Sequence, residues 1–300
     1  MRAVQYRICS RLLNWIDVPE YIYAFERDKS IPKMANKHVN KQVVVSMDIK
    51  DFFHTIKQRR LLDLFQRFGI GEQPARTLSE LCTFKAFVPQ GAITSPKLSN
   101  IVAADSFGPD IKAFCDSRNL TLTIYADDIT VSTTDANLNV GEVIAGITSI
   151  INAHGFRVNT RKTKVMRKYH RQYVCGVVVN EKPNLIRRER LRLRAIVHNV
   201  KVNGPEHEAQ KNQTTVDNFI NVLRGKINWF KQLNKDKAEK LSAELLEALK
   251  LHKTEVQEIK ATSESAVSVV ESGDQSGPLP WEDDITVIGP PEQAPPTLAT

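Results

Sequence analysis

The sequence has no uninterrupted apolar run of about 18 residues, which is the length that a membrane-spanning helix needs. Its first residues, MRAVQYRICS, also lack the long apolar stretch of a secretory signal peptide. Nothing in the chain marks it for membrane insertion or export. We therefore expect a cytoplasmic protein with no membrane partner.

Cysteine is scarce, and the cysteines that are present lie far apart in the sequence. No C-x-x-C pair occurs, which argues against a zinc site or a disulfide framework. We expect reduced and mostly buried thiols at Cys9, Cys82, Cys115 and Cys175.

Lys and Arg are missing from residues 261–300, which contain seven acidic residues and six prolines. This composition predicts a disordered acidic tail that is either uninvolved or regulatory. Because the formal charge of the whole chain is +8, the first 260 residues carry about +15. Such an excess fits a polyanionic partner such as nucleic acid, or simply a solvated basic surface.

Of the residues, 41% are hydrophobic and 25% are charged, as in a globular protein. A β-branched run predicts a strand over residues 41–47, two β-rich arms predict a hairpin over residues 120–132, and a further strand is expected over residues 172–179. Helical spacing is predicted over residues 57–68, 77–84, 95–115, 187–200, 216–233 and 237–251, and for a helix that begins at residue 140 and ends at Gly155. In the third helix, Gly108-Pro109 should cause a break or kink. This order of elements is typical of the α+β class rather than of a doubly wound parallel sheet.

Three aspartates stand where such elements end. Asp48 closes the first predicted strand, and Asp127 with Asp128 lies in the turn of the hairpin. The flanking residues are β-branched or aromatic, so charge in that turn is costly unless a metal or a cation compensates it. Rigid carboxylates suit Mg²⁺, and two such ions about 3.5–4 Å apart can align a hydroxyl with a nucleoside triphosphate.

Three segments resemble successive core motifs of reverse transcriptases, in the family's order and at a similar spacing. They are residues 46–53 (SMDIKDFF), 88–100 (VPQGAITSPKLSN) and 125–128 (YADD). Residues 174–176 (VCG) resemble the V-T-G element of the bacterial retron group, with Cys175 in place of Thr. Residues 35–38 (ANKH) match its N-A-x-x-H at Ala35 and His38, although Met34 stands where the first Asn would be. The resemblance covers roughly residues 1–255.

The resemblance implies an α+β right-hand polymerase fold with a palm, reduced fingers and a helical thumb. The domains we expect are a fingers remnant over residues 1–40, a palm over 41–184 with a fingers-like helical insertion at about 57–90, a thumb over 185–256 and the tail over 257–300. The match starts inside the fingers region. We therefore expect that Met1 is a misassigned start, with a shortened variant as the alternative.

The resemblance also implies roles for individual residues. Asp48 and Asp127 should bind two Mg²⁺ ions, with Asp128 as the third carboxylate and the Ile49 carbonyl as a main-chain ligand. Phe53 should contact the sugar of the incoming deoxynucleotide, with an ordinary core Phe as the alternative. Gln90 should touch that nucleotide, and Gly91 should let the backbone approach it. Lys162, in the N-x-x-K-T element, should protonate or neutralise the pyrophosphate leaving group, or else contact a phosphate.

Residues 157–194 contain 13 Lys or Arg and two Glu, and we expect this stretch to follow nucleic-acid phosphates. A retron-type enzyme implies a structured non-coding RNA as template and primer, an RNA–DNA hybrid product, dNTP substrates, and an effector protein in anti-phage defence. The alternatives are a group II intron-like or other prokaryotic reverse transcriptase and, from another class, a catalytically silent RNA-binding subunit.

Overall fold

The computed structural model describes residues 1–270, with side chains as far as His252. Two units are distinguished, Met1–Leu249 and Lys250–Thr300, and the site discussed below lies within the first. The last described helix, α11 (Lys235–Val270), continues past residue 256, where the thumb is predicted to end. Residues 271–300 of the predicted tail lie outside the described residues. Within the described part, no helix combines the length and the apolar character that crossing a membrane requires.

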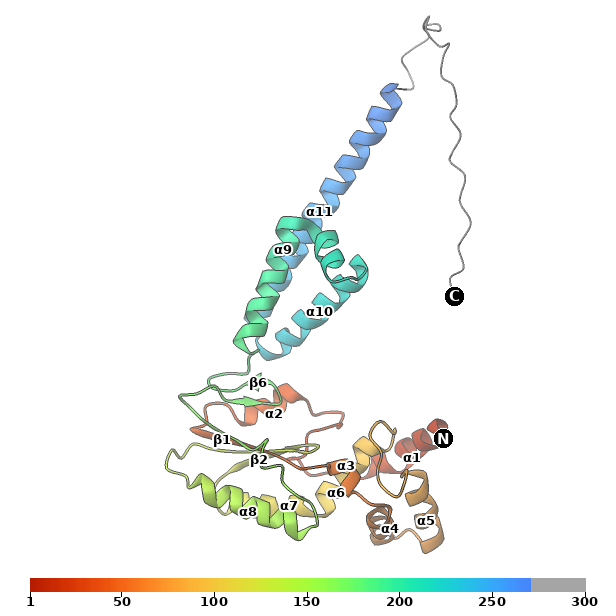
Figure 1. Cartoon of the computed structure of the whole chain (residues 1–300), viewed down its shortest axis with the longest axis vertical. Coiled ribbons are helices and arrows are strands. Elements are labelled where there is room, and N and C mark those ends of the chain that lie inside the picture. Colours follow the sequence, from red (N-terminus) through yellow and green to blue (C-terminus); the bar gives the residue numbers. More distant parts are fainter. Residues whose placement is uncertain (271–300) are drawn as a thin grey trace, which may run out of the picture. The chain divides into compact units, whose positions relative to one another are not determined.

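A four-stranded antiparallel sheet in the order β2-β3-β1-β4 forms the centre of the first unit (Figure 1). Its strands are β1 (Val43–Asp48), β2 (Thr121–Tyr125), β3 (Asp128–Thr133) and β4 (Lys164–Arg167). Five of the six β1 residues are buried, which explains the run of β-branched side chains. The first predicted strand and the predicted hairpin are confirmed.

Helices α7 (Phe107–Asp116) and α8 (Val140–Ala153) lie on one face of this sheet (Figure 1). Gly146 of α8 lies against the Phe114 ring, where an added Cβ would come within 2.4 Å of a ring carbon. The close approach of the two helices therefore requires glycine at this position. The neighbouring α6 (Ser95–Asp105) is buried along most of its length. The predicted helix over 95–115 is broken, as expected, but the break lies at Ser106 and not at Gly108-Pro109.

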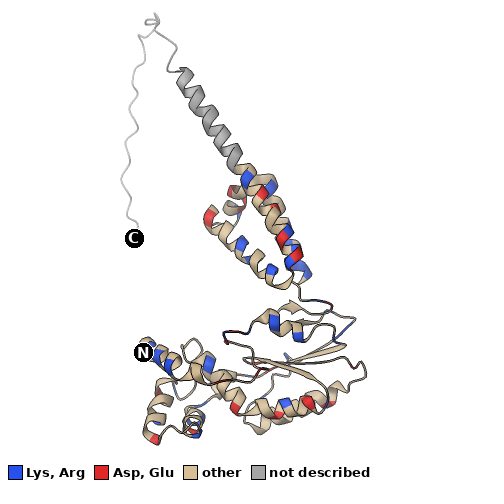
Figure 2. Ribbon diagram, turned by 180° about the vertical axis from the view of Figure 1, so that it is seen from behind, with Lys and Arg blue, Asp and Glu red and all other residues tan. Residues whose placement is uncertain are grey.

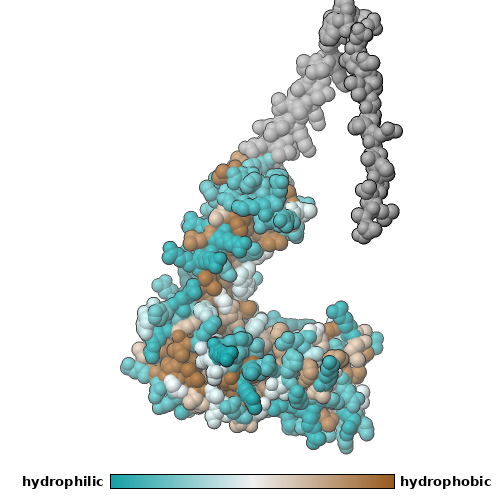
Figure 3. Space-filling model, viewed as in Figure 1, coloured by the Kyte–Doolittle hydropathy of each residue, from teal (hydrophilic) through white to brown (hydrophobic). Residues whose placement is uncertain are grey.

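Short helices precede and follow β1. They are α1 (Arg2–Arg11), the 3-10 helix η1 (Leu13–Trp15), α2 (Ile31–Lys37), α3 (Phe52–Thr55), α4 (Gln58–Arg67) and α5 (Glu72–Leu81). α4 buries Leu61, Leu64 and Phe65, and it packs against α5. The outer surface of this region is mostly hydrophilic (Figure 3). The predicted helix 77–84 begins earlier, at Glu72, because Pro74 is accommodated in the first turn.

The predicted single strand over residues 172–179 is wrong. Two short strands, β5 (Tyr173–Val174) and β6 (Val177–Val178), pair with each other. The turn between them consists of Cys175 and Gly176, both with positive φ (45° and 81°). Two-residue hairpin turns require this backbone conformation, which glycine adopts without strain.

Three helices follow: α9 (Arg187–Lys211), α10 (Val216–Leu233) and α11. α9 extends past the predicted end at residue 200, and a kink at Gly204 (φ 82°, ψ 159°) accommodates Pro205 inside it. α10 has the predicted bounds and begins at Thr215, whose side chain accepts a hydrogen bond from the Asn218 amide. Both basic and acidic side chains occur along this helical region, and the first turns of α9 are predominantly basic (Figure 2).

His38 is fully buried and connects the helical segment before β1 to the hairpin strands. Its Nδ1 lies 2.7 Å from Ser132 Oγ, and its Nε2 lies 2.8 Å from Thr123 Oγ1. Burial, with a smaller contribution from Lys41, lowers the pKa of His38 to about 3. The imidazole is therefore neutral at neutral pH and forms part of the framework.

Candidate active site

The β1–β3 register places two of the three aspartates opposite each other. Asp48 pairs with Asp128 at the end of the ladder. Asp127 follows Ala126 in the two-residue turn of the β2–β3 hairpin, and the positive φ of Ala126 (55°) allows this tight reversal. The Ile49 amide donates a hydrogen bond to the Asp127 carbonyl (2.9 Å), which ties the turn to the end of β1. All three aspartates thus lie at one end of the sheet.

The segment before β4 brings a lysine to the same place. The Asn159 amide donates to the Asp48 carbonyl (2.7 Å), and the Lys162 amide donates to the Asn159 carbonyl (3.0 Å). The Lys162 side chain then reaches back, and its Nζ donates to Asp48 Oδ1 at 2.9 Å. The Asp48 side chain is 9% exposed and that of Lys162 is 62% exposed, so the ammonium group approaches a largely buried carboxylate from the solvent side.

The three carboxylates of this cluster carry more negative charge than the one ion-paired lysine compensates. Burial, followed by repulsion from Asp127 and Asp48, raises the pKa of Asp128 to about 6. Burial, and to a lesser degree the charge of Asp48, also raises the pKa of Asp127. The hydrogen bond to Asp48 raises the pKa of Lys162 and favours its charged form. A further cation would stabilise the ionised aspartates.

A cavity of about 170 Å³ opens beside the carboxylates. Asp48, Asp128 and Lys162 line it together with residues that sequence reasoning did not place there: Ser46, Lys164, Tyr173, Cys175 and Gly176. Lys164 lies opposite Ser46 in the β1–β4 register, and its ammonium lies 5.1 Å from the centre of the Tyr173 ring. Lys162 lies in the turn that precedes β4, and Lys164 is the first residue of that strand. Burial and both hairpin aspartates raise the pKa of the Cys175 thiol to about 12.

The donor atoms suit a divalent cation of the hard, oxygen-binding kind, since carboxylate oxygens dominate the cluster. Among the described residues, however, no three His, Cys, Asp or Glu side chains form a ready-made metal-binding group. One oxygen of Asp48 is already engaged by Lys162. A bound cation would therefore share Asp48 with the lysine or displace it.

The predicted nucleotide-contacting residues do not line this cavity. Phe53, in α3, is half-buried, and its ring centre lies 5.7 Å from that of Phe52. Gln90 and Gly91 are exposed in the turn before α6, and Gly91 has φ +91°. The Ser95 hydroxyl fixes this turn by donating to the Pro89 carbonyl (2.6 Å).

A second polar cluster lies between α6 and the loop that contains Glu26. Lys97 Nζ lies 2.9 Å from Glu26 Oε2, and both side chains are largely buried. Asn100 Nδ2 also donates to Glu26 Oε1 (2.9 Å) and contacts the Ala24 carbonyl. This network anchors the loop around Glu26 to α6.

We expect Lys97→Met to lower the free energy of unfolding by about 2 kcal/mol, because it leaves the Glu26 carboxylate buried without its cation. Adding Glu26→Gln should recover part of the loss. Urea denaturation measures both, with Lys112→Met as the control, since Lys112 and Asp116 form an exposed pair expected to contribute less than about 1 kcal/mol. Equal effects of the two lysine variants would show that the Lys97 network is not important for stability.

Comparison with known proteins gives the family of the chain. Residues 1–241 match the model of the family described as reverse transcriptase (RNA-dependent DNA polymerase). The chain belongs to the reverse transcriptase family. This confirms the predicted family and is consistent with its α+β fold.

Within this reverse transcriptase family, similar curated proteins are retron enzymes. The chain is 31% identical to the retron Mx65 reverse transcriptase of Myxococcus xanthus over 81% of its own length and 58% of the relative. It is 27% identical to the retron Ec86 reverse transcriptase of Escherichia coli over 67% of its own length and 62% of the relative. The retron Mx162 reverse transcriptase of M. xanthus is 31% identical, with 70% of this chain and 50% of the relative covered. The chain thus spans about half to three fifths of the length of these relatives.

Proposed function

We propose that this chain is a retron-type reverse transcriptase that synthesises DNA from dNTPs on an RNA template. The observation that carries the proposal is the gathering of Asp48, Asp127, Asp128 and Lys162 at one end of the sheet. The family match and the retron relatives support it.

In this proposal, Asp48, Asp127 and Asp128 hold two Mg²⁺ ions, with the Ile49 carbonyl as a main-chain ligand. When bound, the ions supply the positive charge that activates the primer hydroxyl and steadies the triphosphate. Lys162 has a charged ammonium at the edge of the carboxylate cluster. It would neutralise or protonate the departing pyrophosphate, and Gln90 and Gly91 would contact the incoming nucleotide.

Phe53 is proposed to exclude ribonucleotides by contact with the 2′-hydroxyl. We expect Phe53→Ala to raise ribonucleotide incorporation relative to deoxynucleotide incorporation by about tenfold or more, because a smaller side chain leaves room for the hydroxyl. Primer extension with competing dNTPs and NTPs measures the ratio. Phe68→Ala, at the end of α4, is the control. An unchanged ratio for the Phe53 variant would remove this assignment.

The proposed template and primer is a structured non-coding RNA, held in part by the exposed basic residues of the 157–194 stretch. An effector protein in anti-phage defence and a cytoplasmic location complete the proposal. The retron relatives support the RNA assignment by analogy.

Purified protein with its co-purifying RNA tests this function. With Mg²⁺ and dNTPs it should add DNA to that RNA. DNase should degrade the added DNA, and RNase should degrade the RNA to which it is joined. If the protein holds RNA tightly but incorporates no deoxynucleotide, the enzymatic proposal fails and the chain is a catalytically silent RNA-binding subunit.

A further inference from the structure

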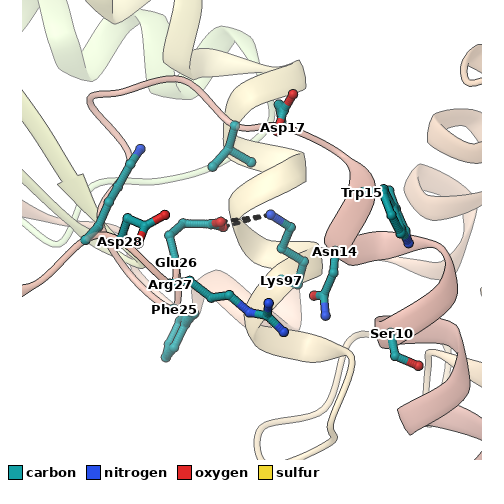
Figure 4. A pocket seen from close by; sticks show the side chains of 11 residues that line it. Ser10, Asn14, Trp15, Asp17, Phe25, Glu26, Arg27, Asp28 and Lys97 are labelled. Atoms are coloured by element: carbon teal, nitrogen blue, oxygen red, sulfur yellow. Dashed lines mark hydrogen bonds and ion pairs between the residues drawn. The ribbon is translucent and has the colours of Figure 1, made fainter.

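A cavity of about 470 Å³ lies apart from the carboxylate cluster, between η1, the loop of residues 24–29 and the start of α6. This volume is in the range of small-ligand sites. The Lys97–Glu26 ion pair lies in it, and Trp15 and Phe25 lie on opposite sides (Figure 4). Arg27 and Asn14 extend between the two aromatic side chains (Figure 4).

Both aromatic residues are exposed to an unusual degree. Trp15 is 81% exposed and Phe25 is 52% exposed, and neither side chain belongs to the hydrophobic core. Phe25 also adopts φ +58°, a left-handed conformation that is rare for a bulky side chain. The Asn100 contact to the Ala24 carbonyl and the ion pair of Glu26 with Lys97 hold the backbone on either side of it. The fold thus maintains an exposed ring at a strained position, as is common at binding sites.

The loop that carries Phe25 begins directly beside the β2–β3 hairpin. The Tyr23 amide donates to the Ile124 carbonyl (2.8 Å), and the Ile124 amide donates to the Tyr21 carbonyl (2.7 Å). The Phe25 ring centre lies 6.2 Å from that of Tyr125, two residues before Asp127. The loop that lines this cavity is therefore in direct contact with the hairpin that carries Asp127 and Asp128.

The charges of the cavity cancel. Three acidic and three basic residues line it: Asp17, Glu26, Asp28, Arg27, Lys29 and Lys97. Lys97 is paired with Glu26, and Lys29 donates to the carbonyls of Pro19 and Ile22. Arg27 has no hydrogen-bond or ion-pair partner among the described residues, so its guanidinium is available for stacking or for a polar contact. Such a lining favours the flat face of an uncharged ring over a run of phosphates.

We propose that this cavity is a stacking site for bases of single-stranded nucleic acid, with Trp15 and Phe25 as the platforms and Arg27 as the polar contact. Aromatic side chains and Arg planes bind unpaired bases in this manner and tolerate any sequence. This proposal rests on the proposed function in one respect, since both require that the protein binds a single-stranded nucleic acid. It adds base contacts that depend little on salt to the salt-dependent phosphate contacts of residues 157–194.

Fluorescence anisotropy with full-length protein and a labelled single-stranded RNA of about 12 nucleotides tests the proposal. Trp15→Ala and Phe25→Ala should each weaken binding by about 5- to 100-fold. Trp15→Phe, which keeps a ring, should bind within a few fold of the wild type. Phe84→Ala is the control, because Phe84 is 61% exposed but does not line the cavity. Unchanged thermal midpoints show that the variants are folded.

An abasic strand of the same length separates base stacking from phosphate binding. The wild type should bind it about as weakly as Trp15→Ala binds the normal strand, and the dependence of affinity on salt should be the same for wild type and variants. The proposal would be overturned if both Ala variants bound the normal strand with wild-type affinity. It would also be overturned if the Ala substitutions weakened binding of the abasic strand as much as binding of the normal strand, or if the wild type bound no single strand. The mixture contains no dNTP and no divalent cation. A protein that stacks bases but extends no primer therefore refutes the proposed function and leaves this site standing.

Discussion

Asp127→Asn should lower the rate of dNTP incorporation by roughly 10³-fold or more, while RNA binding stays close to that of the wild type. The substitution keeps the size of the side chain but removes a negative charge from the turn of the hairpin. That charge is one of three that we assign to divalent cations. Single-turnover primer extension measures the rate, and anisotropy with labelled RNA measures binding.

Asp116→Asn is a suitable control for this experiment. Asp116 lies at the end of α7 and pairs with Lys112 on the surface, so its loss should change neither quantity. An Asp127→Asn protein that incorporates dNTPs within tenfold of the wild-type rate would remove Asp127 from the site. Loss of RNA binding in the same variant would indicate a damaged fold instead.

His38 should make the protein sensitive to acid. Because its folded-state pKa of about 3 lies below the usual value of 6.5, the unfolded chain binds a proton that the folded chain does not. The contribution of the neutral imidazole is fully present above pH 6.5 and is lost as the pH falls toward 3. Between pH 7 and pH 4 this amounts to about 3 kcal/mol in the free energy of unfolding.

His38→Gln isolates this contribution, since an amide can hydrogen-bond with Ser132 and Thr123 but does not titrate in this range. Urea denaturation at pH 7 and pH 4 should show a decrease for the variant that is about 3 kcal/mol smaller than for the wild type. The exposed His198, replaced by Gln, should leave the wild-type dependence intact. Identical pH dependence in the His38 variant and the wild type would mean that the buried imidazole accepts a proton without cost.

Elements with a strong local signal were predictable from the sequence. β1 and the hairpin follow from β-branched runs, and α10 follows from its helical spacing. The failures occurred where backbone conformation overrides such signals. The Cys175-Gly176 turn divides a β-rich stretch without the usual Asn or Asp, and α9 continues through Pro205 because Gly204 adopts a non-helical conformation.

The composition of the site was only partly accessible from the sequence. The motifs point to Asp48, Asp127 and Lys162, which the register and one hydrogen bond bring to the same end of the sheet. Lys164 and Tyr173 were not predicted as site residues. Their place in the cavity depends on the pairing of β4 with β1, which joins segments more than 100 residues apart. Pairing over such distances leaves no local pattern.

Template-directed incorporation by the purified wild-type chain tests most directly whether the carboxylate cluster synthesises DNA. A defined heteropolymeric RNA, annealed to a DNA primer and supplied with Mg²⁺ and one dNTP at a time, should direct addition of the complementary deoxynucleotide and reject the other three. Addition of the complementary nucleotide by the wild type but not by Asp48→Asn would support the assignment of DNA synthesis to the carboxylate cluster. Absence of incorporation by a folded, RNA-binding wild-type protein, or equal incorporation by Asp48→Asn, would contradict it.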